Sequence, residues 1–148
     1  MIEIRPATAA DAPAVARLLN QLVREEIAQE KIGERLHRLA MTGADPVFLA
    51  CDKGVAIGLL ALHLAPILHY ARPALRITEL VVDHRQRRRG VGRRLVAHAE
   101  REALAAGCEI IELTSALDRA DAHAFYRSLG FEANSLRFRK LPRPKADQ

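Results

Sequence analysis

Apolar residues recur along the chain with two different spacings, and the spacings predict different elements. Ile2 to Arg5 alternates apolar and polar residues before Pro6, which is typical of a short strand. After Asp11, a good N-cap residue, apolar residues recur every three or four positions, which predicts a helix. The apolar face of that helix comprises Val15, Leu18, Leu19, Leu22 and Val23.

A second helix and then several strands are expected in the middle of the chain. Residues 30–40 carry one apolar helical face, and the Asp45-Pro46 pair stops the helix. The turn Asp52-Lys53-Gly54 lies between two strand-like runs and predicts a hairpin. The expected strands span residues 47–51, 55–64 and 75–82.

The remaining sequence alternates helix and strand. Residues 91–106 form one apolar helical face and are followed by Gly107, an apt residue for a helix C-terminus. A strand on either side of this helix implies a parallel pair. The further expected elements are a strand over 109–114, a helix over 121–129, and strand-like sequence at Phe131 and over 136–141.

This order predicts an α/β (α+β) fold with a mixed central sheet of six to seven strands and helices on both faces. A length of 148 residues, without an internal repeat or linker, suits one domain over residues 1–148. Residues 142–148 are rich in proline and charge and are expected to form a flexible tail.

Composition narrows the class of protein. Hydrophobic residues make up 49% of the chain and aromatic residues only 4%, so aliphatic side chains must fill the core. Cys51 and Cys108 are far apart and lack metal-ligand spacing, which favours small core residues in a reduced, cytoplasmic compartment. No signal peptide and no apolar stretch long enough to span a membrane is found.

The basic residues are unevenly distributed. The net charge is +5, and six arginines fall within residues 85–94. This run favours an anionic partner, and it fits a solvated loop, a nucleic-acid patch or a phosphate-binding corner. Glycines inside the run favour the phosphate-binding corner.

The run also lies at a junction suited to phosphate. The apolar strand end Leu80-Val81-Val82 leads into the basic loop, and a helix begins at Gly90-Val91-Gly92. The first N–H groups of a helix lack internal partners and carry partial positive charge, and glycines let a phosphate approach them. A Walker loop is excluded, because Arg93-Arg94 stands where that loop needs Lys-Ser or Lys-Thr. A dinucleotide-binding fingerprint is excluded as well, because it needs three spaced glycines and this junction has only Gly90 and Gly92.

The spacing Arg87-x-x-Gly90-x-Gly92 resembles the signature of the GNAT superfamily of N-acetyltransferases. The opening Ile4-Arg5-Pro6-Ala7-Thr8 with Asp11, and the closing Ala124-Phe125-Tyr126-Arg127-Ser128-Leu129-Gly130-Phe131, are similar to those of the family. The likeness covers nearly the whole chain, which is therefore identified as a member of this superfamily with a GNAT fold.

The resemblance implies acetyl-CoA as co-substrate. Main-chain groups of Leu80, Val81 and Val82 are expected to pair with the pantetheine arm, and one N–H there to polarise the thioester carbonyl. A plain buried strand is compatible with this role, because only the backbone is involved. The pyrophosphate is expected to lie on backbone N–H groups of Arg87, Arg88, Arg89, Gly90, Val91, Gly92 and Arg93.

One residue departs from the family pattern. Many relatives carry an asparagine that contacts the CoA arm where this chain has Arg119. Ser115, Arg119 and His123 are the candidates to replace it, and the sequence does not choose among them.

Two residues are candidates for proton transfer. Tyr126 stands where the family places its general acid, and a phenol suits protonation of a departing thiolate. The alternative is a core aromatic residue whose hydroxyl reaches the surface. Glu79 lies in the strand where the family often has a base; the alternative is an ordinary polar position.

Three stretches resemble bacterial aminoalkylphosphonate N-acetyltransferases: His63 to Tyr70, Thr78 to Val82, and Asp118 to Tyr126, together with the ending Leu136 to Leu141. That likeness implies a small phosphonate acceptor, and a divalent metal is associated with some members, although no metal site is predicted here. The expected acceptor-binding residues are His63, His69, Tyr70 and His123. Strand packing, loop exposure and helix capping are the respective alternatives for the three histidines.

Other functions remain open at this stage. A drug amine, polyamine, amino acid or protein N-terminus is an alternative acceptor, and a sensor that only binds acetyl-CoA is another reading. A nucleic-acid-binding module is disfavoured by the few aromatic residues and by the glycines within the basic run. The expected partner is thus a small amine, without nucleic acid or membrane; a homodimer is left open, since dimers are common in the superfamily.

Overall fold

The computed structural model describes residues 1–23 and 26–143, so most of the expected tail over 142–148 lies outside the described residues. The chain divides into two compact units, Met1–Leu113 and Thr114–Gln148. The prediction of a single domain stays a prediction. In the described part of the chain, no helix combines the length and apolar character needed to cross a bilayer.

The first unit is built on a mixed five-stranded sheet whose strands follow one another in chain order. The first four strands pair antiparallel, and the fourth and fifth pair parallel. The predicted hairpin and the predicted parallel pair are therefore confirmed. The strands are β1 (Ile2–Pro6), β2 (Val47–Asp52), β3 (Val55–Ala65), β4 (Ala74–Val82) and β5 (Ile110–Leu113).

The helices of this unit begin and end close to the predicted positions. They are the short η1 (Ala9–Asp11) and η2 (His84–Gln86), with α1 (Ala12–Leu22), α2 (Gln29–Ala40) and α3 (Val91–Ala105). Asp11 occupies the N-cap position of α1, but its carboxylate accepts from the Thr8 N–H at 2.8 Å and pairs with Arg5. The hydrogen bond from Arg5 holds the pKa of Asp11 at about 2.

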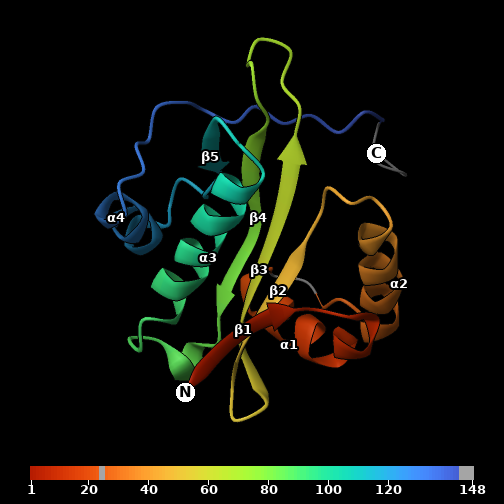
Figure 1. Cartoon of the computed structure of the whole chain (residues 1–148). Coiled ribbons are helices and arrows are strands. Elements are labelled where there is room, and N and C mark those ends of the chain that lie inside the picture. The colour runs from red at the N-terminus through yellow and green to blue at the C-terminus, as the bar shows by residue number, and fades with distance from the viewer. Residues whose placement is uncertain (24–25, 144–148) are drawn as a thin grey trace. The chain divides into compact units, whose positions relative to one another are not determined.

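Successive residues of the central strands alternate between two helical layers. Leu49, Leu59 and Val81 pack with α1 and α2 in one buried cluster. On the opposite face, Phe48 contacts the ring of His98 from α3, with ring centroids 4.3 Å apart. Figure 1 shows α1 and α2 on one side of the sheet and α3 on the other. The predicted placement of helices on both faces is confirmed.

Gly58 in β3 allows α3 to approach the sheet closely. A Cβ at this position would lie 3.0 Å from Leu95 Cδ1, 3.1 Å from Val91 Cγ1 and 3.3 Å from Ala50 Cβ. These distances are at or below the limit of ordinary contact, so a side chain would push the first turns of α3 outward. A glycine here therefore sets the position at which α3 begins.

The second unit contains α4 (Ala120–Ser128) and a long segment without regular structure. The strands predicted at Phe131 and over 136–141 are wrong, which leaves five strands in the described residues instead of six to seven. Leu136 is 67% exposed and Phe138 is 90% exposed. Alternation of apolar and basic residues is a local signal, whereas a strand also needs a hydrogen-bonding neighbour.

A partly buried ion pair ties α1 to Asp83, the residue that follows β4. Asp83 is the one charged residue among the buried described residues, and its Oδ2 accepts from Arg17 Nη1 at 2.8 Å. Arg17 also donates to the Ala56 carbonyl at 2.6 Å, and the Arg85 N–H donates to Asp83 Oδ1 at 3.1 Å. The Arg85 and Arg17 hydrogen bonds hold the pKa of Asp83 below its usual range, although burial opposes them. The loop that follows β4 thus starts from an anchored residue.

Asp83→Asn is expected to lower the free energy of unfolding at pH 7 by about 1–3 kcal/mol, because Arg17 loses its charged partner. The pKa of Asp83 is lowered on folding, so the stabilisation is present above the unfolded pKa and is lost as pH falls through the folded pKa. The deficit of the variant in urea unfolding should therefore be full at pH 5 and smaller at pH 2, because the folded pKa lies below the usual value of about 4. A deficit that is equal at both pH values, or equal to that of the exposed Asp118→Asn, would contradict the role of this pair.

Candidate active site

β4 carries a neighbouring strand on both sides for only part of its length. It pairs with β5 from Ala74 to Ile77, where β5 ends at Leu113, and with β3 as far as Val82. From Thr78 to Val82, no strand in the described part of the chain covers the second edge of β4. An uncovered edge exposes main-chain donors and acceptors, which an extended ligand can pair with. Leu80, Val81 and Val82, predicted from the sequence to hold a coenzyme arm, lie on this stretch.

A bulge in the pairing of β3 with β4 lies at the point where β5 separates from β4. Ala61 pairs with Glu79 and Leu62 pairs with Ile77, so Thr78 is an extra residue on β4. The Thr78 hydroxyl donates to the Ala61 carbonyl at 3.2 Å. Bulges bend a strand and re-aim the side chains beside them. The bulge therefore sets the direction of Glu79 at the start of the open edge.

The loop after β4 has an unusual backbone. Arg88 has φ 65° and Gly90 has φ 75°, both in the left-handed region. For an arginine this conformation costs about 1–2 kcal/mol. Gly90 is the N-cap of α3, no side chain caps this helix, and its first turn contains no acidic residue. A Cβ at Gly90 would have nothing within 4 Å, so the space before the helix is open. This corner is suited to an anion at the positive end of the helix.

Two arginines of the basic run serve the structure of the corner. Arg89 donates to Asp52 in the β2–β3 turn at 2.9 Å and also to Gln86. Arg94 donates to the Ile2 carbonyl at 2.7 Å. The guanidinium of Arg89, whose backbone N–H is predicted to contact the pyrophosphate, is therefore engaged by Asp52. The sequence offered no signal for this pairing, since the two residues are distant in the chain.

Glu79 lines a half-open apolar cavity of about 160 Å³ that is bounded by α1, α2 and the sheet. Glu79 is half-buried, and this burial raises the pKa of its carboxyl. Arg35 of α2 also lines the cavity and was not singled out by the sequence, because it sits at an exposed helical position. The apolar lining residues are Val15, Leu19, Val23, Ile27, Ile32, Leu36, Leu39, Val47, Leu59 and Ala61.

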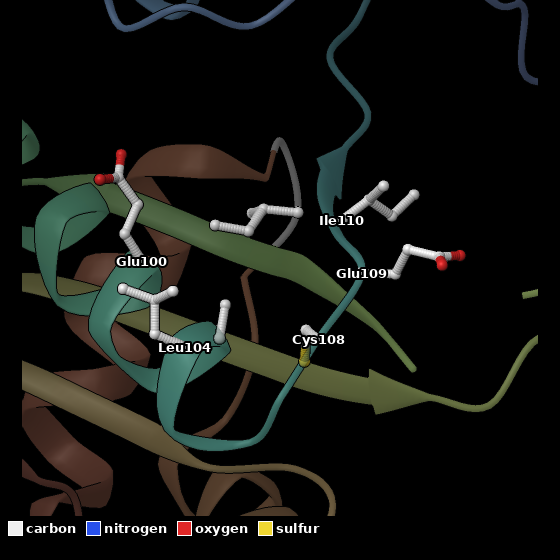
Figure 2. A pocket seen from close by; sticks show the side chains of 7 residues that line it. Glu100, Leu104, Cys108, Glu109 and Ile110 are labelled. Carbon is white, nitrogen blue, oxygen red and sulfur yellow. The ribbon is translucent and has the colours of Figure 1, made fainter. Parts of the chain in front are cut away.

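A second hollow, of about 370 Å³, lies beside the C-terminal part of α3. Glu100 and Leu104 project from α3, and Cys108, Glu109 and Ile110 come from the start of β5 and the segment before it (Figure 2). Burial raises the pKa of the Cys108 thiol, which is half-buried, whereas Cys51 is fully buried. None of the predicted site residues lines this hollow.

The predicted acceptor-binding residues of the first unit have local partners. His63 Nδ1 lies 2.6 Å from Asp45 Oδ1, and the Thr42 hydroxyl donates to the other Asp45 oxygen at 2.6 Å. Burial of Asp45 acts to raise its pKa, but these hydrogen bonds outweigh it and the pKa is lowered. The rings of His69 and Tyr70 are in contact, with centroids 4.4 Å apart. Among residues 1–23 and 26–143, no group of three or more potential metal-ligating side chains occurs.

In the second unit, Tyr126 is held between aromatic rings of the same unit. Its ring centroid lies 5.4 Å from that of Phe125 and 6.0 Å from that of Phe131, both edge-on. Burial raises the pKa of the Tyr126 hydroxyl, and the charge of Arg119 opposes this shift. The phenol is therefore protonated at neutral pH.

The other predicted residues of this unit lie near the start of α4. His123 donates from Nε2 to the Ala116 carbonyl at 2.8 Å, which fits the capping alternative considered from the sequence. Arg119 is exposed at the N-cap position of α4, and Ser115 is half-buried in the preceding segment. The replacement for the family's asparagine stays open among these three residues.

Comparison with known proteins places these features in a family. A model of the Acetyltransferase (GNAT) family matches residues 13–131. The aminoalkylphosphonate N-acetyltransferase of Salmonella typhimurium LT2 is 33% identical over 138 residues, which cover 93% of this chain and 90% of that protein. An uncharacterised N-acetyltransferase of Bacillus subtilis 168 is 30% identical, covering 95% of this chain and 99% of that protein.

Solved structures agree with this result. A candidate acetyltransferase from Agrobacterium tumefaciens C58 superposes with a TM-score of 0.85 at 28% identity, covering 94% of this chain and 99% of that chain. An aminoglycoside N-acetyltransferase solved in complex with CoA gives 0.82 at 20% identity, covering 95% of both chains, which shows the fold alone. The family and enzyme class predicted from the sequence are confirmed. The chain belongs to the GNAT family of acetyltransferases.

Proposed function

We propose that this enzyme moves an acetyl group from acetyl-CoA to the primary amine of a small molecule, and that the acceptor is an aminoalkylphosphonate. The observation that carries the proposal is the open edge of β4, which leads within a few residues into the uncapped start of α3. The pantetheine arm of acetyl-CoA needs an open strand edge, and the pyrophosphate that follows the arm needs an anion site close to that edge. The same arrangement gives an incoming amine a carboxylate, Glu79, on the open stretch of β4 itself.

The donor is held by backbone groups. Leu80, Val81 and Val82 pair with the pantetheine arm as an added strand would, and an N–H there polarises the thioester carbonyl. The backbone from Arg87 to Arg93 holds the pyrophosphate at the positive end of α3. The open space in front of Gly90 supports this assignment, since a Cβ there meets nothing within 4 Å.

The chemical step requires two proton transfers. The amine nitrogen attacks the thioester carbonyl carbon and forms the new C–N bond, after which the C–S bond breaks and the thiolate leaves. Glu79 accepts the amine proton, directly or through water, and Tyr126 donates its hydroxyl proton to sulfur. The half-buried carboxyl of Glu79 supports the first role, because its raised pKa makes it a stronger base. The protonated phenol of Tyr126 supports the second.

The proposed class of acceptor rests on similarity to a relative of known substrate and on polar side chains that can contact an anionic group. The Salmonella typhimurium relative acts on aminoalkylphosphonates, as its name states, and it matches over most of both chains. His63, His69, Tyr70 and His123 are the proposed contacts to the acceptor. Asp45 orients the His63 ring through Nδ1, which leaves Nε2 available to a ligand.

Gly90→Trp is expected to weaken acetyl-CoA binding about 100-fold, the loss of roughly two charge-assisted hydrogen bonds, because the indole fills the space before α3. Gly107→Trp is the matched control: both glycines have positive φ and open surroundings, and they lie at opposite ends of α3. Both variants should lose similar stability, and only the first should lose affinity in calorimetry. Equal affinities would remove the phosphate site from this corner.

Glu79→Gln is expected to lower kcat/KM by about 10²–10⁴ and to abolish the acidic limb of its pH profile. The pKa of Glu79 is raised on folding, so its ionised form destabilises the protein as pH rises through that pKa. The variant should therefore gain stability over the natural protein at pH 8 but not at pH 4. The exposed Glu109→Gln should show neither effect. A persisting acidic limb in Glu79→Gln would assign the base to another group.

Tyr126→Phe is expected to lower kcat by about 10²–10⁴ while acetyl-CoA affinity stays unchanged, because only the donated proton is lost. Phe131→Leu removes one of the rings packed on Tyr126 and serves as the control, with reduced stability but an intact hydroxyl. Single-turnover kinetics and calorimetry measure the two quantities. A Tyr126→Phe enzyme that turns over at the natural rate would exclude the phenol as the acid.

A further inference from the structure

The cavity beside Glu79 has a lining of unusual composition. Ten of its twelve lining residues are apolar, and the other two, Arg35 and Glu79, carry opposite charges. Arg35 comes from α2, one turn from the buried Ile32 and adjacent to the buried Leu36, whereas Glu79 comes from the sheet. A cationic and an anionic side chain therefore reach one apolar cavity from two different walls.

The two charges do not neutralise each other. Burial is the one cause that shifts the pKa of Glu79, and a nearby guanidinium would act in the opposite direction. In the described part of the chain, no ion pair of Arg35 is found. Arg35 is exposed and Glu79 is half-buried, so the cost of leaving water falls on the carboxylate of Glu79. The geometry leaves room between them for a molecule that carries both complementary charges.

The volume limits the size of that molecule. A water molecule occupies about 30 Å³ in the liquid, so about 160 Å³ corresponds to roughly five waters. This space suits a short chain of a few carbon atoms with a polar group at each end. The apolar lining from α1, α2 and the sheet suits the carbon atoms.

We infer that Arg35 is the residue that selects an acceptor with an anionic group opposite its amine, and this inference rests on the proposed function. The amine lies at Glu79, where it loses its proton, and a phosphonate or carboxylate lies at Arg35. None of His63, His69, Tyr70 and His123 is among the lining residues of this cavity, so Arg35 takes their place as the contact to the anionic group. A guanidinium presents paired donors that match both anions in a two-point contact. A diamine would place its second ammonium group beside Arg35, and the repulsion would exclude it.

The inference is tested with four acceptors of matched length and different second groups. These are 2-aminoethylphosphonate, β-alanine, propylamine and 1,3-diaminopropane, each assayed by thiol release from acetyl-CoA with and without chelator. The natural enzyme should favour the two anionic amines in kcat/KM. The ratio of kcat/KM for 2-aminoethylphosphonate to that for β-alanine shows which anionic group the enzyme prefers. The role of Arg35 is supported whichever of the two anionic amines reacts faster.

Arg35→Met should lower kcat/KM for the anionic amines about 10- to 100-fold, mainly through KM, and leave propylamine within about threefold. Arg35→Lys should recover part of the loss. Arg38→Met is the matched control, since Arg38 is exposed on the same helix and does not line the cavity. Calorimetry of 2-aminoethylphosphonate with the CoA-loaded protein should show the same order of affinities.

Two outcomes would overturn the inference, and they differ in what they mean. If all four amines react equally well and Arg35→Met behaves as Arg38→Met does, Arg35 does not select the acceptor, although acetyl transfer stands. If the enzyme releases no thiol with any amine in either condition, the proposed function fails together with the inference.

Discussion

The separation of β4 from β5 is the constraint on which the rest of the structure depends. Main-chain donors and acceptors need partners, and the last five residues of β4 have a strand on one side only. The bulge at Thr78 lies at the point of separation, so the conformation of β4 itself changes where its pairing with β5 ends. The functional proposal follows from this edge, because an extended coenzyme arm can supply the partners that β5 does not.

The phosphate corner is held in place by contacts that are distant in sequence. Asp83 is anchored to Arg17 of α1, Arg89 is tied to Asp52 of the hairpin turn, and Gly58 lets the first turns of α3 rest on β3. The left-handed backbone at Arg88 is a strained conformation, and such strain persists only where surrounding contacts impose it. The loop is therefore preorganised, and a preorganised loop needs less ordering to bind the diphosphate of the proposed co-substrate.

Burial gives the candidate proton-transfer groups their chemistry. Glu79 lies against an apolar cavity and Tyr126 lies among aromatic rings, and in both cases loss of water raises the pKa. For the carboxyl this means a stronger base, and for the phenol it means a proton retained until sulfur requires it.

The sequence by itself determined the family, most element boundaries and the junction of strand, basic loop and helix after β4, because these features depend on consecutive residues. The apolar run Leu80-Val81-Val82, the basic loop and Gly90-Val91-Gly92 follow one another, so spacing alone identifies a strand, a turn and a helix start. The strands predicted at Phe131 and over 136–141 were wrong because alternation records local preference and says nothing about a pairing partner. Only the tertiary structure decided that Arg35 shares a cavity with Glu79 and that Arg17 pairs with Asp83, since both pairs join distant segments. In sequence these arginines look like ordinary solvent-facing helix positions, and only packing of the helices on the sheet gives them partners or a cavity.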